Sequence, residues 1–433
     1  MPLSPTPRPS APGASAPTTT RPGSATPRTA LSRTVSALAV AAAATVALPL
    51  TASAQSMIPG GGPVGSSTDS LGSLAPETPL PPGPEVEVDV LADGFTIPWD
   101  VARDPSGVVV TGERGSGTVH AIGTDGEPTV VDADFGQLFT GGESGLMGIA
   151  LADDFATSRE VYTCHSSEDH GDNRVTAWTA ADDWSALESP RVLVADIPLH
   201  PGGYHSGCRI LAHPDGTLYI GTGDASNGPG PQDPASLAGK ILHVNRDGST
   251  AVDEPVEGAP ADSPVLTVGH RNVQGLAVQP GGDRVYAAEH GPAVDDEVNL
   301  VQPRGNYGWD PNRGGEYNQD VPMTDTRAFP DAVPAVWSSG APTLAPGGMT
   351  FLDDPAWGEW NGAMAVAMLK TSQIVLMKLS PEGNSVTETA TLLRDVHGRM
   401  RSVTAEPGGS LLVTTSNGGG ADEVLRVRPA AAE

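Results

Sequence analysis

The chain has 433 residues, including 53 glycines, 42 prolines and only two cysteines, and its formal net charge is −28. This length fits two or three domains or one large all-β domain. So acidic a surface repels nucleic acid and anionic membranes, which excludes a nucleic-acid-binding protein, and it favours neutral substrates or cationic partners.

The first 54 residues have the composition of an export signal. Residues 1–27 are rich in Pro, Ser, Thr and Ala, and Arg28 and Arg33 then precede a charge-free apolar run that ends in Ala52-Ser53-Ala54. A basic segment, an apolar segment and a small-residue site in this order predict a signal peptide with an extended basic region, cleaved after Ala54. The alternative is an uncleaved anchor, but the run is short and alanine-rich for a membrane span. We therefore expect a secreted, extracellular protein without stable membrane insertion after cleavage.

The next segment, residues 55–84, is expected to be a disordered linker. It is rich in Gly, Pro and Ser and has few large apolar side chains, so it cannot bury enough apolar surface to offset its ordering entropy. Cleavage after Ala54 removes four arginines and no acids, which leaves 20 basic and 52 acidic residues and a net charge of −32. The folded catalytic domain is expected to span residues 85–430.

An internal repeat organises this domain. A pattern of apolar strand, Pro/Asp/Gly turn and apolar strand recurs six times, starting at Trp99, Gly145, Cys208, Gly275, Gly347 and Arg401. The turns use the residues that β-hairpins require, and further short apolar runs follow most copies. Six units of about four strands predict an all-β, six-bladed β-propeller, because one such blade cannot bury both of its faces alone. A pair of β-sandwiches or a β-helix is the alternative.

The two cysteines, Cys164 and Cys208, lie in expected strands of successive repeats. In an exported protein such cysteines commonly pair, so we favour a disulfide between them over two buried free thiols.

Polar residues precede or end the repeats at positions that a propeller would bring to one end of its axial channel. The segment "GHRNVQG", residues 269–275, is the densest example. The full set, with the neighbouring residues of each segment, is Pro98, Trp99, Asp100, Glu143, Ser144, Tyr204, His205, His270, Arg271, Asn272, Gln274, Thr343, Lys370, Arg399 and Arg401. Four of these are cations, which repel one another unless an anion lies among them, and arginine is suited to carboxylates. The sequence therefore predicts a small ligand with several carboxylates; the alternative is that each arginine pairs with a neighbouring acid.

The segment "AEHGPAVDDEVNL", residues 288–300, contains a Gly-Pro step that breaks the strand and leaves the carbonyls of Gly291 and Pro292 free, with three acidic residues behind them. Oxygen ligands of this kind favour Ca²⁺ over Zn²⁺. An ordinary acidic surface turn is the alternative.

Several motifs in a fixed order resemble the soluble sugar dehydrogenases that depend on pyrroloquinoline quinone (PQQ), also called the glucose/sorbosone dehydrogenase family. The resemblance runs from about Phe95 to Val427 and rests on "IPWDVA", "GGESGLMGIAL", "HSGCRILAHPDGTLYIGTGD", "GHRNVQGLA", "EHGP", "GNYGW", "APTLAPGGM", "AMLK" and "GRMRSV". It implies a six-bladed propeller with the quinone over the axial opening. It also implies oxidation of the C1 hydroxyl of aldose sugars to lactones by hydride transfer to calcium-bound PQQ.

The resemblance also implies roles for individual residues. His205 corresponds to the general base that takes the sugar proton, and Arg271 to the group that stabilises the oxyanion developing on the quinone. Contacts to the cofactor are implied for Glu143, Asn272, Gln274, Thr343, Lys370, Arg399 and Arg401. The carbonyls of Gly291 and Pro292 match the pair that holds the cofactor-bound Ca²⁺. Tyr204, His290 and Glu143 differ from the glucose enzymes and look closer to the broad-specificity aldose branch.

The partners expected on this basis are aldose sugars and an external electron acceptor, either a quinone or a cationic redox protein; a homodimer is a further candidate assembly. Two other functions stay open. One is a metal-dependent propeller lactonase or hydrolase, which would have little use for four cations. The other is a non-catalytic exported propeller that binds a glycan or a protein, against which the joint presence of His205 and Arg271 argues.

Overall fold

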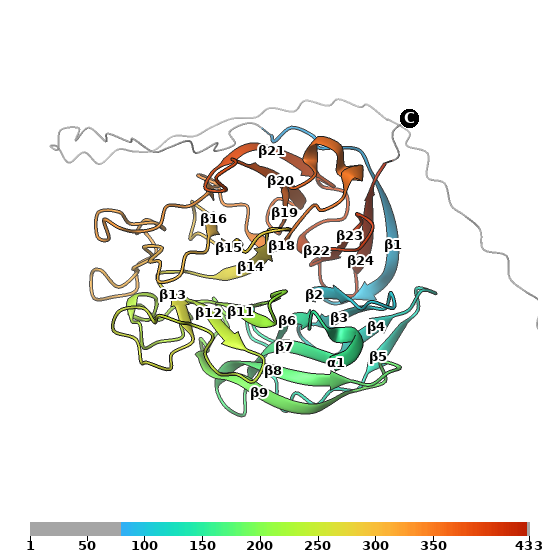
Figure 1. Cartoon of the computed structure of the whole chain (residues 1–433), viewed down its shortest axis with the longest axis horizontal. Coiled ribbons are helices and arrows are strands. Elements are labelled where there is room, and N and C mark those ends of the chain that lie inside the picture. Colours follow the sequence, from blue (N-terminus) through green and yellow to red (C-terminus); the bar gives the residue numbers. More distant parts are fainter. Residues whose placement is uncertain (1–78, 431–433) are drawn as a thin grey trace, which may run out of the picture. The chain divides into compact units, whose positions relative to one another are not determined.

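The computed structural model describes residues 79–430. The expected signal peptide and most of the expected linker lie outside these residues. The described chain forms six four-stranded antiparallel sheets around a common axis (Figure 1), which confirms the predicted six-bladed β-propeller. Between residues 79 and 430, no helix has the length and apolar character needed to cross a bilayer.

The first three blades follow the chain without interruption. Blade 1 contains β2 (Pro98–Arg103), β3 (Val109–Glu113), β4 (Val119–Ile122) and β5 (Pro128–Val131). Blade 2 contains β6 (Leu146–Leu151), β7 (Glu160–Ser167), β8 (Asp172–Ala180) and β9 (Leu187–Pro198), with the short helix α1 (Phe155–Ser158) between β6 and β7. Blade 3 contains β10 (Gly207–Ala212), β11 (Thr217–Thr222), β12 (Ile241–Asn245) and β13 (Val265–Thr267), with a 3₁₀ turn, η1 (Gly230–Gln232).

The last three blades include the closure of the ring. Blade 4 contains β14 (Val273–Val278), β15 (Val285–Glu289), β16 (Glu297–Leu300) and β17 (Trp337–Ser338). Blade 5 contains β18 (Pro346–Phe351), β19 (Met364–Met368), β20 (Gln373–Leu379) and β21 (Val386–Leu392), with η2 (Pro355–Trp360). Blade 6 joins β22 (Met400–Ala405), β23 (Leu411–Thr415) and β24 (Asp422–Pro429) to β1 (Val86–Phe95) from the start of the domain. Backbone hydrogen bonds between β1 and β24 therefore hold the two ends of the domain together.

The inner strand of each blade begins within two residues of a repeat start identified in the sequence. These strands are buried because neighbouring blades pack against both of their faces, whereas an outer strand such as β5 is largely exposed. One apolar cluster spans the contact between blades 2 and 3 and includes Trp99, Met147, Ile210 and Leu242. The core thus lies between blades, which is why the repeats cannot fold singly.

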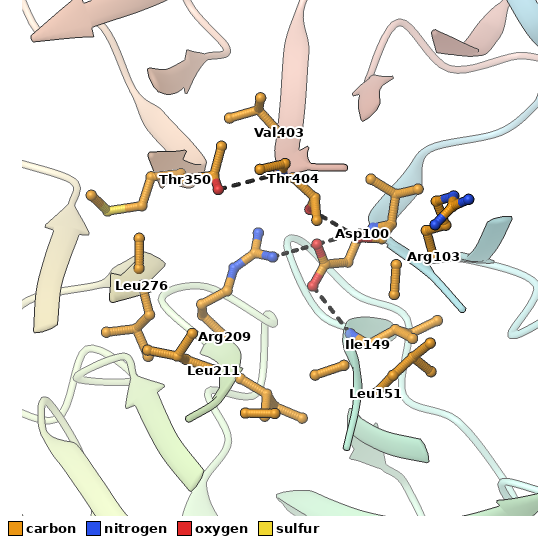
Figure 2. A pocket seen from close by; sticks show the side chains of 18 of the residues that line it. Asp100, Arg103, Ile149, Leu151, Arg209, Leu211, Leu276, Thr350, Val403 and Thr404 are labelled. Carbon is orange, nitrogen blue, oxygen red and sulfur yellow. Dashed lines mark hydrogen bonds and ion pairs between the residues drawn. The ribbon is translucent and has the colours of Figure 1, made fainter. Parts of the chain in front are cut away.

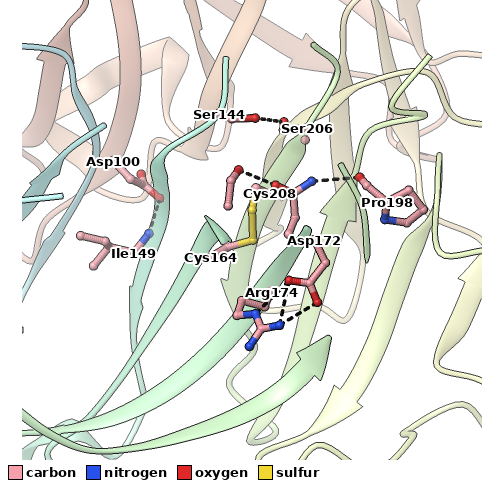
Figure 3. The surroundings of a disulfide bond; sticks show 12 residues. Asp100, Ser144, Ile149, Cys164, Asp172, Arg174, Pro198, Ser206 and Cys208 are labelled. Carbon is pink, nitrogen blue, oxygen red and sulfur yellow. Dashed lines mark hydrogen bonds and ion pairs between the residues drawn. A yellow bond between two sulfur atoms is a disulfide. The ribbon is translucent and has the colours of Figure 1, made fainter. Parts of the chain in front are cut away.

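A disulfide crosses this same contact. Cys164 on β7 and Cys208 on β10 are bonded, with a Cα–Cα distance of 5.5 Å (Figure 3), as the sequence predicted. The two cysteines are 44 residues apart, so the cross-link lowers the entropy of the unfolded chain by an amount worth about 4 kcal/mol at 25 °C. It also fixes the first residues of β10, directly after His205.

The end of the segment expected to be a linker is held against blade 5. Gly83 N donates to Thr391 O and Thr391 N donates to Pro81 O, each at 2.9 Å. Leu80 packs against the apolar cluster shared by blades 4 and 5. Contacts with the folded domain therefore start before residue 85.

Candidate active site

The loops that lead into the inner strands carry most of the residues predicted to form the site. Glu143 precedes β6, His205 precedes β10, Thr343 precedes β18, and Arg271 and Asn272 lie between β13 and β14. These loops share one end of the propeller axis because all inner strands run in the same direction along it. We call the group of polar side chains at this end the cradle.

Hydrogen bonds around Glu143 connect four blades. Glu143 Oε2 accepts from Asn272 Nδ2 and from Gln274 Nε2, both at 3.0 Å. Asn272 Oδ1 accepts from the backbone N–H of Gly207 at 2.9 Å, which ties the loop of His205 to blade 4. Gln274 Oε1 in turn accepts from Arg401 Nη2 on blade 6. Residues far apart in sequence are thereby fixed relative to one another.

Two of the predicted cations are buried in the cradle with unused donors. Arg401 is 6% exposed and its guanidinium lies 4.4 Å from the centre of the Trp99 ring. Burial, reinforced by nearby Arg209, lowers the pKa of Arg401 to about 9, although Glu143 opposes the shift. Arg271 is 5% exposed and donates to His290 O at 3.0 Å and to Gln319 Oε1 at 2.6 Å. Both side chains keep a buried Nε–H without a hydrogen-bond partner.

A third arginine of this kind was missed in the sequence. Arg114, just beyond β3, donates to Gly142 O at 2.7 Å, and its Nε–H is also buried without a partner. Burial lowers the pKa of Arg114, while Glu143 raises it and Arg399 lowers it further. Buried donors without acceptors are costly, so three of them within the cradle favour an anionic ligand at this end of the propeller.

The other two predicted cations lie at the rim. Lys370 and Arg399 are exposed. Lys370 Nζ donates to Thr343 Oγ1 at 3.0 Å, which brings these two predicted residues together. The sequence analysis did not distinguish among the four predicted cations. In the structure, Arg271 and Arg401 are buried, whereas Lys370 and Arg399 are exposed.

His205 forms a buried pair with Asp224, a residue that the sequence analysis did not single out. The imidazole Nδ1 lies 2.7 Å from Asp224 Oδ1. Asp224 is fully buried, and its Oδ2 accepts from Trp309 Nε1 at 2.8 Å and from Tyr317 Oη at 2.9 Å. Because a carboxylate only accepts hydrogen bonds, Asp224 fixes the proton on Nδ1 and leaves the Nε2 lone pair available as a base.

The backbone of His205 supports this orientation. Its φ is +52°, in the left-handed region that few non-glycine residues occupy, and such conformations concentrate at functional sites where the surroundings enforce them. Burial and the neighbouring Asp224 carboxylate raise the pKa of Tyr317, so its phenol remains a donor to Asp224.

A second buried pair holds Arg271 in place. His270 Nδ1 lies 2.7 Å from Glu289 Oε1, and Glu289 Oε2 accepts from the backbone N–H of Arg271 at 2.7 Å. In "GHRNVQG" the histidine therefore turns into blade 4 and anchors the loop, whereas the arginine faces the cradle.

The loop with the predicted calcium ligands is shaped by Asp296. Its Oδ1 accepts from Gly291 N at 2.9 Å, and its Oδ2 accepts from Leu344 N and Ala345 N at 2.5 and 2.7 Å. Among the hydrogen bonds of residues 79–430, none ends on the carbonyl of Gly291 or Pro292. The same residues contain no cluster of three or more acidic, histidine or cysteine side chains that could hold a metal. A cation here would depend on these carbonyls and on the ligand itself.

Comparisons with known proteins point to one family. The family model described as glucose/sorbosone dehydrogenase matches residues 95–426. The chain is 32% identical to an uncharacterised protein of Synechocystis over 79% of this chain and 87% of that protein. It is 28% identical to the aldose sugar dehydrogenase of Escherichia coli over 79% of this chain and 93% of that protein. The PQQ-bound aldose sugar dehydrogenase of Streptomyces coelicolor superposes with a TM-score of 0.66 at 30% identity, covering 80% of this chain and 99% of that one.

Proposed function

The chain belongs to the glucose/sorbosone dehydrogenase family, and we propose that it oxidises the C1 hydroxyl of aldose sugars to lactones with PQQ and Ca²⁺ and passes the electrons to an external acceptor. One observation carries the proposal: the buried His205–Asp224 pair belongs to the same cradle as three arginines with unpartnered N–H groups. An aldose as substrate is supported by the names of the similar proteins from Escherichia coli and Streptomyces coelicolor.

The donor set of the cradle fits a quinone that carries several carboxylates. Arg114, Arg271 and Arg401 offer buried N–H groups, and Lys370 and Arg399 add charge at the rim. Arginine binds carboxylates strongly through paired N–H groups. Asn272, Gln274, Thr343 and Glu143 would complete the contacts. The carbonyls of Gly291 and Pro292 would hold Ca²⁺, which prefers such oxygen ligands.

His205 would take the proton of the sugar hydroxyl. Asp224 keeps the Nδ1 proton in place, so Nε2 is the nitrogen that accepts, and the same carboxylate stabilises the imidazolium that forms. Trp309 and Tyr317 occupy the other oxygen of Asp224 and prevent it from turning away. When bound, the quinone supplies the two-electron acceptor for the hydrogen that leaves C1.

Arg271 would stabilise negative charge that develops near the reacting atoms. Its guanidinium is held at both ends, by His290 O and by Gln319, and its backbone is held by Glu289. A donor fixed before the reaction begins loses no free energy in reorienting, which is the basis of electrostatic preorganisation.

The acceptor and the location of the enzyme are further parts of the proposal. A chain with a net charge of −32 after cleavage is suited to a cationic redox protein or to a small neutral quinone as acceptor. Export follows from the signal peptide predicted over residues 1–54. N-terminal sequencing of the secreted protein should give Gln55 as its first residue.

Aldose-dependent dye reduction tests the activity. Purified protein reconstituted with PQQ and Ca²⁺ should reduce an artificial dye when aldoses are added. His205→Ala should lower kcat by about 10² to 10⁴-fold, the usual contribution of a general base, with PQQ affinity retained. If the wild-type protein binds PQQ but reduces dye with no member of a broad aldose panel, the proposed activity is wrong. Full activity of His205→Ala would remove this residue from the mechanism.

A further inference from the structure

The inner strand of every blade has an irregularity close to its start. In each of the six sheets, the pairing between the inner strand and its neighbour shifts register there, which leaves one or two residues of the inner strand without a cross-strand partner. In blade 3 this residue is Cys208, between Gly207 and Arg209. Such β-bulges re-aim nearby side chains and are frequent next to active sites. The bulge of blade 3 lies three residues after His205.

Cys208 differs from the residues at the same place in the other blades. Among the residues of 79–430 that these register shifts leave unpaired, it is the one with a positive φ, +64°. Left-handed backbone lowers the population of a residue that has a Cβ by about tenfold. Because the other five bulges form without this conformation, the propeller architecture does not require it. A contact specific to blade 3 must therefore hold it.

The disulfide is that contact. Cys164 on β7 is bonded to Cys208, and both residues are buried (Figure 3). The chain has no other cysteine, so none of the other bulges is cross-linked. The one covalent link between blades thus ends on the one bulge residue with left-handed backbone.

The strand beyond the bulge is held independently of the disulfide. Figure 2 shows Arg209, the next residue, facing Asp100 of blade 1. Arg209 Nη1 lies 2.5 Å from Asp100 Oδ1, and its Nε donates to Gln274 O at 2.7 Å. The body of β10 therefore does not need the bridge to keep its place in the propeller.

The segment before the bulge depends on fewer contacts. Three of its four residues are left-handed, with φ of +52° at His205, +61° at Gly207 and +64° at Cys208. Such a run persists only where the surroundings enforce it. The restraints on its middle are single hydrogen bonds: Gly207 N donates to Asn272 Oδ1 at 2.9 Å, and one at 2.8 Å links Ser206 Oγ to the loop before β6. A change of backbone conformation at residue 208 would therefore reach His205.

We propose that the Cys164–Cys208 disulfide positions His205. It holds residue 208 in the left-handed conformation and thereby keeps the imidazole against Asp224. The effect on turnover rests on the function proposed for His205, whereas the effect on the imidazole itself does not. Both sulfurs are buried, so variants test this role more directly than a reductant would.

Two variants without the bridge separate positioning from stability. Cys164→Ala/Cys208→Ala keeps a Cβ at residue 208, whereas Cys164→Ala/Cys208→Gly removes it and accepts left-handed backbone at no steric cost. Both lose the same cross-link, and both are compared with the wild type in trimethylamine N-oxide, which favours the folded state. Glu406→Ala is the control for stability alone, because Glu406 lies in the turn after β22, away from the cradle, and pairs with Arg103 and Arg426.

Turnover with PQQ, Ca²⁺ and an aldose is the first readout. The alanine variant should have a kcat about tenfold below that of the wild type, because residue 208 then prefers other conformations by about that factor. Its KM for the sugar and its PQQ affinity should not change. The glycine variant should regain kcat to within about twofold, and Glu406→Ala should keep the wild-type kcat. Wild-type kcat in the alanine variant, or an equal loss of kcat in both bridge-free variants, would overturn the proposal.

The second readout needs neither cofactor nor sugar. In ¹⁵N NMR of the full chain at a pH where the imidazole is neutral, the His205 signals are assigned by their absence from His205→Ala. They should show the proton on Nδ1 in the wild type and the glycine variant, and a mixture of the two tautomers in the alanine variant. If they do so while the wild type oxidises no aldose, the positioning role stands and the proposed activity is wrong. Wild-type His205 signals in the alanine variant would contradict the positioning role.

Discussion

Two groups of arginines in this propeller differ in how completely their N–H donors are used. Beside the closure of the ring, Glu406 accepts two bonds from Arg426, at 2.6 and 2.8 Å, and lies 3.2 Å from Arg103 Nε, while Ser410 Oγ donates at 2.9 Å. In the cradle, Arg114, Arg271 and Arg401 each keep a buried Nε–H without an acceptor. The contrast separates charges that hold blades together from charges that are arranged for a ligand.

The consequence is that the two groups should respond differently to the same kind of change. Loss of the shared carboxylate leaves two partly exposed arginines without their charged hydrogen bonds, which weakens the fold. Arg114, Arg271 and Arg401 donate hydrogen bonds to backbone carbonyls or side-chain amides and to no carboxylate. Loss of one of these cations should therefore cost the folded protein little stability and weaken ligand binding.

The largest effect is expected within the cradle, at Asp224. Asp224→Asn should lower kcat by about 10³-fold or more, because the imidazole is no longer held in the tautomer that leaves Nε2 free. The KM for the sugar and the affinity for PQQ should change little, and Asp224→Glu should restore part of kcat. Steady-state kinetics over a range of aldose concentrations give kcat and KM separately. A loss confined to KM would show that Asp224 does not orient His205.

The next effect concerns the paired arginines. Glu406→Ala removes the charged hydrogen bonds that the partly exposed Arg426 and Arg103 make to the buried carboxylate, and we expect the free energy of unfolding to fall by about 2 kcal/mol. Chemical denaturation measures this change, and PQQ titration of the same variant should give the wild-type affinity. If Glu406→Ala alters PQQ affinity and not stability, the assignment of the two groups is reversed.

Arg114 offers a smaller effect on the cradle side. Arg114→Met keeps an apolar side chain of similar length but removes the guanidinium, so PQQ should bind about tenfold more weakly. The free energy of unfolding should stay within about 0.5 kcal/mol of the wild-type value, since Arg114 has no acidic hydrogen-bond partner. An unchanged PQQ affinity would exclude Arg114 from the ligand site.

The smallest effect is a pH dependence at a buried acid. Burial, and then the neighbouring Glu289 carboxylate, raise the pKa of Glu297 to about 8. A carboxyl whose pKa is higher in the folded than in the unfolded state stabilises the fold most below its unfolded pKa, and this contribution is lost as pH rises to about 8. The Tm, measured in a buffer that contains a metal chelator, should therefore fall between pH 5 and pH 8. In Glu297→Gln the Tm should depend less steeply on pH. A steeper slope in the variant would contradict this assignment.

The fold could be predicted from the sequence because each blade repeats one local pattern. Strand, turn and strand recur with the same turn chemistry, so the inner strands were placed within two residues of their observed starts. The disulfide followed because both cysteines fell in such strands. The sequence did not predict that β1 completes blade 6 or that residues 79–84 contact blade 5, because neither segment belongs to a repeat and a Pro-rich segment has no local signal for the edge strand that it contacts.

The site was harder to predict where it depends on how deeply a side chain is buried or on residues from segments without a repeat pattern. His205 and Arg271 could be identified because they lie just before the start of a repeat. The same criterion did not distinguish the buried Arg401 from the exposed Arg399. Tyr317 and Gln319 lie in the long connection between β16 and β17, which has no repeat pattern. Asp224 follows β11 at the end of the motif "GTGD", and only the geometry of blade 3 shows that it meets His205.

The central claim is that Arg114, Arg271 and Arg401, which each keep one buried N–H group without an acceptor, bind a polycarboxylate quinone. Its most direct test is titration of the protein with PQQ in the presence of Ca²⁺, followed by tryptophan fluorescence, for the wild type, Arg401→Met and Glu406→Ala. Tight binding by the wild type, affinity about 10 to 100-fold weaker in Arg401→Met and wild-type affinity in Glu406→Ala are the predicted results. Equal affinity of the wild type and Arg401→Met would contradict the claim.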